Sequence, residues 1–159
     1  MTNHNNLPLH SRVWIYQADR TLAPAEVNVV YERFDEFMKK WHSHGQPLSA
    51  AYEVRYDKFL ILYVDEATAP VSGCSIDSSV AVVKSLEADL GIEFMNRQLI
   101  AWKEGIEIKQ LPMSEFWAHR KAGLVTSETI VFNNLVKNKQ EFLAGWEGPF
   151  SESWHATMW

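Results

Sequence analysis

The sequence contains a single cysteine, Cys74, in 159 residues. One cysteine forms no disulfide within the chain, and no Cys-x-x-Cys redox motif is present. No apolar run approaches the roughly 20 residues that a helix needs to cross a bilayer. Residues 1–9 are polar and lack the apolar centre of a secretory signal. We therefore expect a cytoplasmic protein that enters no membrane.

Runs of like charge are missing as well. The net charge is -5, and acidic and basic residues are spread over both halves of the chain, with no run of five or more of one sign. Proteins that bind nucleic acids or anionic membrane surfaces concentrate positive charge. The sequence thus predicts neither kind of partner.

Internal repeats and Pro/Gly/Ser-rich linkers are also lacking, while 47% of the residues are apolar and 13% aromatic, enough to bury a core. We expect one domain over residues 1–159, with a flexible N-terminus at residues 1–10. The tail at residues 148–159 carries Phe150, Trp154 and Trp159. Because exposed aromatic rings lose the free energy of burial, the tail is predicted to pack on the domain or on a partner subunit, and the second alternative makes the protein a homodimer.

Hydrophobic periodicity predicts an α+β fold. Apolar alternation and β-branched runs indicate strands at residues 12–17, 52–56, 59–64, 99–102, 106–111 and 129–132. Helical spacing and capping signals indicate helices at residues 24–42, 80–90, 114–123 and 138–146. Glu53 and Arg55 are expected on a solvated face of their strand. The order of elements up to residue 102 is the split βαββαβ pattern of ferredoxin-like domains, followed by a C-terminal strand and helix extension.

The candidate site lies between the apolar strand at residues 59–64 and the helix expected from Val80. Small residues and helix-capping side chains are crowded there, as a chain needs when it turns sharply from a strand into a helix. We expect Asp77 to be the N-cap, and the free amides of the helix start to bind a small anionic ligand. The alternative is that the serines only cap the helix and form the turn. The predicted ligand-binding residues are Ser72, Gly73, Cys74, Ser75, Asp77 and Ser78.

Four segments together resemble a family of small bacterial proteins with no established activity. They are Trp14-Ile15-Tyr16-Gln17, Trp41 through His44-Gly45, Ser72-Gly73-Cys74-Ser75-Ile76-Asp77 and Ser153-Trp154-His155. Some members of that family carry the label of ABC-transporter ATPase. The sequence lacks the Gly-x-x-x-x-Gly-Lys-Ser/Thr loop that cradles nucleotide phosphates, so we set that label aside.

Two functions follow from these residues. The first is a small ligand-binding or interaction module with its pocket at the loop from Ser72 to Asp77. The alternative is a thiol-dependent enzyme, in which Cys74 at a helix N-terminus is the nucleophile and His44 or His155 is its base. His42 and His44 are two residues apart, but the sequence places no third ligand beside them, so we predict neither a metal nor another cofactor.

Overall fold

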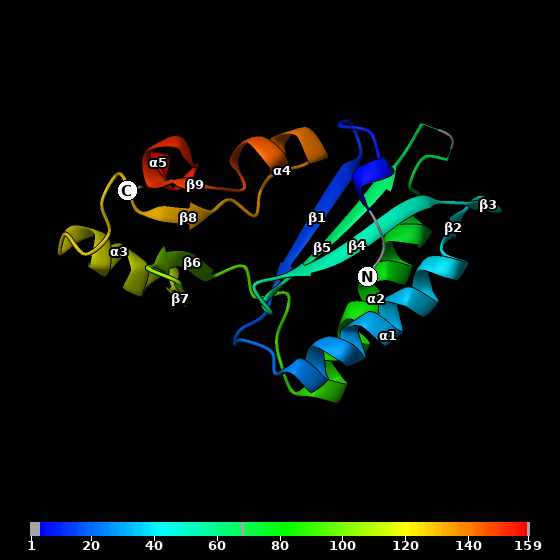
Figure 1. Ribbon diagram of the computed structural model, residues 1–159, viewed down its shortest axis with the longest axis horizontal. Helices are drawn as coiled ribbons and strands as arrows, with labels where there is room; N and C mark the ends of the chain where they lie inside the picture. The colour runs from blue at the N-terminus through cyan, green and yellow to red at the C-terminus, as the bar shows by residue number, and fades with distance from the viewer. Residues whose placement is uncertain (1–3, 68, 159) are drawn as a thin grey trace. The chain divides into compact units, whose positions relative to one another are not determined.

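The computed structural model describes residues 4–67 and 69–158, and it has the expected α+β class, with antiparallel sheets (Figure 1). The described chain forms two compact units, residues 4–95 with Lys137–Lys139 and Asn96–Val136 with residues 140–158. No linker in the sequence indicates this division, and cooperative folding as one domain stays a prediction. No helix among the described residues combines the length and apolar character needed to span a membrane.

The first unit is built on a three-stranded antiparallel sheet in the order β1-β5-β4. Its strands are β1 (Arg12–Gln17), β4 (Ser49–Arg55) and β5 (Phe59–Asp65), close to the predicted positions. Its helices are α1 (Pro24–Lys40) and α2 (Gly73–Leu90). Three small elements complete the unit: the 3-10 turn η1 (His4–Asn6), and a hairpin of β2 (His42–Ser43) and β3 (Gln46–Pro47).

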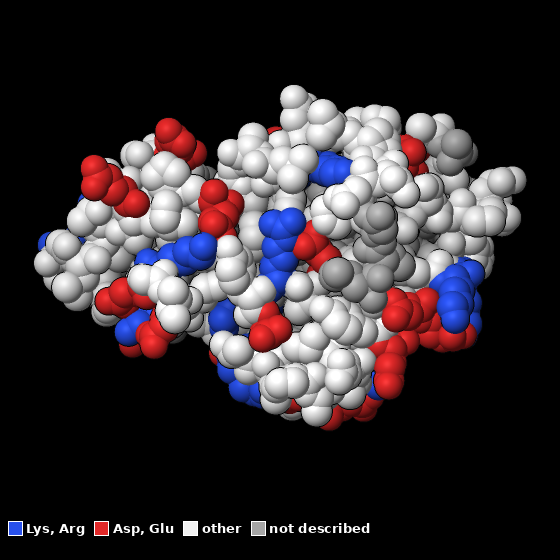
Figure 2. Space-filling model, viewed as in Figure 1, with Lys and Arg blue, Asp and Glu red and all other residues white. Residues whose placement is uncertain are grey.

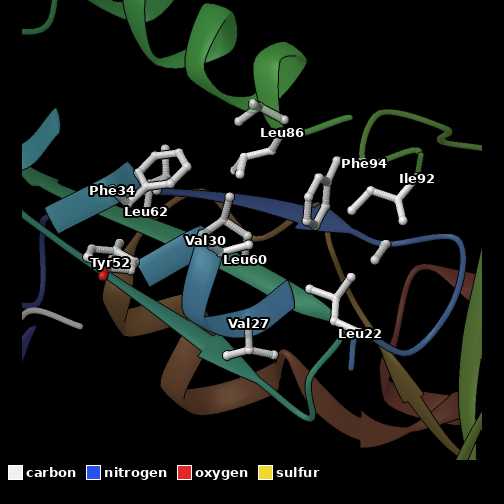
Figure 3. Packing of buried hydrophobic residues seen from close by; sticks show 12 residues of the cluster. Leu22, Val27, Val30, Phe34, Tyr52, Leu60, Leu62, Leu86, Ile92 and Phe94 are labelled. Atoms are coloured by element: carbon white, nitrogen blue, oxygen red, sulfur yellow. The ribbon is translucent and has the colours of Figure 1, made fainter. Parts of the chain in front are cut away.

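The main core of the first unit lies between the sheet and the two helices (Figure 3). Val27, Val30 and Phe34 recur at helical spacing on α1 and point towards the sheet, as the sequence predicts. Leu60 and Leu62 alternate on β5 and face them, since every second side chain of a strand lies on one face. Val83 and Leu86 of α2 complete the cluster, which fixes α2 on this side of the sheet.

The predicted fourth strand of the ferredoxin-like sheet belongs to a different sheet. Leu99–Glu104 forms β6, which pairs with β7 and β8 in the second unit. The free edge of β1 instead receives residues 137–139: Val13 N donates to Lys137 O at 3.0 Å and Lys139 N donates to Ser11 O at 2.9 Å. Periodicity identified the strand at 99–104, but it carries no information about which edge the strand joins.

The second unit holds a four-stranded antiparallel sheet in the order β7-β6-β8-β9. Gly105, with φ 66°, lies in the turn between β6 and β7, where a left-handed residue suits a tight hairpin. Trp102, Phe116 and Phe150 are buried in its core, so the described part of the aromatic tail packs on its own unit. The remaining elements are β7 (Glu107–Pro112), α3 (Met113–Lys121), β8 (Ile130–Phe132), α4 (Lys139–Gly145), β9 (Glu147–Pro149), η2 (Phe150–Glu152) and α5 (His155–Met158).

Charged side chains of both signs are interspersed over the face that Figure 2 displays, without a large area of one sign. This agrees with the charge distribution along the sequence. That the protein binds no nucleic acid stays a prediction.

Candidate functional site

Helix α2 begins at Gly73, seven residues before the predicted start at Val80, and its N-cap is Ser72. The prediction that Asp77 caps this helix is therefore wrong, because Asp77 lies inside the second turn and is exposed. Ser72 has the extended backbone that an N-cap needs, with φ -100° and ψ 166°.

The serines explain why so polar a stretch is helical. Ser75 N donates to Ser72 Oγ at 3.1 Å, while Ser72 N donates to Ser75 Oγ at 2.8 Å, so two amides at the helix start are satisfied reciprocally. Ser78 Oγ donates to Cys74 O, and Ser79 Oγ donates to Ile76 O. Hydroxyls that donate to carbonyls of the preceding turn leave no buried polar group unpaired. The capping role that the sequence left open for the serines is thus present.

The first turn of α2 is anchored by Trp41, the residue that ends α1. The indole Nε1 of Trp41 donates to Ser75 O at 2.8 Å in a buried position. Trp41 is itself buried in a small cluster with Leu48, Val64 and Ala69. A buried hydrogen bond between two rigid elements fixes the position of the helix start.

Two amides of this turn remain without a partner. Among the described residues, neither Gly73 N nor Cys74 N makes a hydrogen bond, and both residues are exposed. The first turn carries no acidic residue, so the positive end of the helix dipole is not neutralised from within. Backbone donors and an unopposed dipole favour a negatively charged group at this position. Cys74, which the sequence places beside a helix start, lies in this turn with its side chain exposed.

The histidines predicted as partners of Cys74 lie on elements other than α2. His44 is exposed in the turn between β2 and β3, where it takes a positive φ of 51° next to Gly45. His155 belongs to the second unit, whereas Cys74 belongs to the first. Within the described part of the chain, no hydrogen bond joins Cys74 to a histidine. No group of three or more His, Cys, Asp and Glu side chains suited to a metal ion occurs among the described residues.

His155 is almost fully buried, at 1% exposure. Its Nδ1 lies 2.7 Å from Ser153 Oγ, and its ring stacks on Trp154 at 4.0 Å between centroids. Burial lowers the pKa of His155 to about 4, because the charged imidazolium loses its hydration. His155 is therefore neutral at physiological pH and packs as part of the aromatic core.

A second polar cluster was missed from the sequence. The prediction that Glu53 lies on a solvated face is wrong. Glu53 is 5% exposed and accepts hydrogen bonds from Tyr63 Oη at 2.6 Å and from Arg55 Nε. His4 Nε2 lies 2.8 Å from the same carboxylate. The alternation of Glu53 with apolar residues carries no signal of this burial, because His4 and Tyr63, which cover Glu53, come from other parts of the chain.

Comparisons of the chain with protein-family models, with curated proteins and with solved structures find no match.

Proposed function

We propose that the protein is a small binding module that takes an anionic ligand at the first turn of α2. The observation that carries this proposal is the pair of unpartnered, exposed amides at Gly73 and Cys74, in a turn without acidic residues. The reciprocal caps of Ser72 and Ser75 support it, since they fix the turn before any ligand arrives. A preorganised donor set loses little entropy on binding.

Gly73 offers a matched pair of variants for the test. It is the first helical residue, a Cβ added there meets nothing within 4 Å, and Ser72 already has the extended backbone that precedes proline. Gly73→Pro thus removes one unpartnered amide and keeps the helix, whereas Gly73→Ala keeps the amide. We expect phosphate to raise the melting temperature of Gly73→Ala more than that of Gly73→Pro.

The comparison between the two variants controls for the general stabilisation that phosphate gives to folded proteins, because that effect acts on both. Sodium chloride at the same ionic strength controls for screening. Equal phosphate shifts in Gly73→Pro and Gly73→Ala would refute the anion site.

A thiol-dependent enzyme is the second candidate, and the exposure of Cys74 in the first turn of α2 favours it. A helix N-terminus stabilises a thiolate. We expect iodoacetamide to alkylate Cys74 in the folded protein at neutral pH faster than it alkylates free cysteine. His44→Gln tests the general base: an alkylation rate unchanged by this substitution excludes His44, and a rate no faster than that of free cysteine excludes the enzyme.

Three finer assignments belong to the same proposal. We infer that the first unit is a ferredoxin-like arrangement in which residues 137–139 take the edge position of the fourth strand, a view supported by the strand order β1-β5-β4. A reducing, cytoplasmic location suits a single exposed thiol. Self-association is tested by sedimentation over a range of concentrations, where a monomer at high micromolar concentration contradicts it.

A further inference from the structure

The segment His4–Leu7, which we term the strap, is attached to the first unit through the side chain of His4 and through two backbone carbonyls. At the side chain, His4 Nε2 meets Glu53 Oε2 at 2.8 Å, and the imidazole stacks on Tyr63 with 4.6 Å between centroids and 8° between planes. At the backbone, Lys139 Nζ donates to His4 O at 2.8 Å and to Leu7 O at 2.9 Å. The imidazole of His4 and the ammonium group of Lys139 thus both hold the strap in place.

The contact with Glu53 defines the protonation of His4. A carboxylate only accepts hydrogen bonds, so Nε2 carries the proton in the neutral ring and Nδ1 is left with a lone pair. His4 Nδ1 is buried and has no hydrogen-bond partner among the residues that the structure describes. A second proton would therefore sit on Nδ1, in a place without an acceptor, and such a donor costs about 1–3 kcal/mol.

The charged and titratable groups that face His4 come from three elements. Glu53 and Arg55 lie on β4, Tyr63 lies on β5, and Lys139 lies at the start of α4. Glu53 favours the imidazolium, but its carboxylate already accepts hydrogen bonds from Arg55 and Tyr63. The positive charges of Arg55 and Lys139 disfavour a further positive charge on His4. Burial is the largest effect and lowers the pKa of His4, with Lys139 and Arg55 acting in the same direction.

We propose that the strap is an acid-released latch, which stays on the sheet while His4 is neutral and leaves it when His4 is protonated. Releasing a few residues costs less than unfolding the sheet, because such short segments open locally. Release frees His4 to be protonated in water and removes both carbonyl acceptors from Lys139. Because the pKa of His4 is lowered in the docked strap, docking favours the neutral imidazole. The contribution of His4 to docking is therefore complete above about pH 6.5 and is lost as the pH falls below that value.

Hydrogen exchange at Leu7 tests the latch. Leu7 N donates to His4 O at 3.0 Å within the strap, and this single turn, held by Lys139 Nζ at both carbonyls, is not stable on its own once the strap leaves. We expect the protection factor of Leu7, corrected for intrinsic exchange, to fall about threefold or more between pH 7.5 and pH 5. The amide of Val30, in the core of the same unit, serves as the internal reference.

Two substitutions separate the latch from other effects of acid. His4→Gln keeps a donor at the position of Nε2 but does not titrate, so its Leu7 protection should be the same at both pH values. His10→Gln removes the nearby exposed histidine, which pairs with Asp65 at 3.1 Å, and should leave the fall unchanged. The latch is overturned by an equal fall in His4→Gln, by loss of the fall in His10→Gln, or by constant protection in the wild type.

Discussion

Lys58 is a buried residue whose ammonium group makes no ion pair with the described residues, and its replacement by an apolar residue should stabilise the protein. Lys58 is 2% exposed, and within the described residues its ammonium group has neither a hydrogen bond nor an ion pair. The turn before it, in which Tyr56 and Asp57 take positive φ angles of 55° and 50°, directs the chain into this position. Desolvation lowers the pKa of Lys58, and the nearby charge of Asp19 offsets only part of this effect.

Methionine has a similar length and no charge, so Lys58→Met removes the desolvation cost and keeps the packing. We expect the free energy of unfolding to rise by about 1–3 kcal/mol at pH 7, the order of the gain when an apolar residue replaces a buried charged group. The assay is urea unfolding, read as the shift of the midpoint at constant slope. Lys84→Met, at an exposed position on α2, is the control and should change stability by less than about 0.5 kcal/mol.

The dependence on pH makes this prediction specific to the charge of Lys58. Because the pKa is lowered in the folded state, the unfolded state binds more protons, and the stability of the wild type rises as the pH approaches about 10.5. The advantage of Lys58→Met should therefore shrink between pH 7 and pH 10. A destabilised variant, or an advantage that is the same at both pH values, would refute the reasoning.

Three further predictions concern caps and buried polar groups. Ser72→Ala should cost about 1 kcal/mol, measured by thermal unfolding, because the N-cap of α2 is lost; an unchanged stability would show that the cap is dispensable. Tyr52→Phe should cost about 1–2 kcal/mol in urea, since Tyr52 Oη donates to Asp35 Oδ1 at 2.6 Å and lies 3.0 Å from Tyr31 O; a cost below about 0.3 kcal/mol would contradict this bond. His155 should titrate near pH 4 by NMR and lower the stability as the pH falls from about 6.5 towards 4; a midpoint above 6 would contradict its burial.

Local patterns were sufficient for most individual elements. The strand at Arg12–Gln17 matches its prediction, and α1 begins at Pro24 as predicted. Helix α2 begins earlier than its apolar spacing indicates, because Ser72 and Ser75 cap each other's amides at its start. Apolar periodicity does not register such bonds.

Long-range pairing could not be predicted. The strand at Leu99–Glu104 has the composition of a fourth sheet strand, yet its Ile100 and Trp102 pack in the core of the second unit. Likewise, Glu53 alternates with apolar residues as a solvated residue does, and only the approach of His4 and Tyr63 buries it. Tyr63 and His4 are 10 and 49 positions from Glu53, a separation that no local pattern encodes.

The account of function rests on the claim that the first turn of α2 offers its unpartnered amides to an anion. The most direct measurement is a phosphate titration of the ¹⁵N-labelled protein, followed at the backbone amides. We predict saturable shifts at Gly73 and Cys74 that exceed those elsewhere in the first unit. Saturable shifts at other residues while Gly73 and Cys74 stay unmoved, or no saturation at any amide, would contradict the claim.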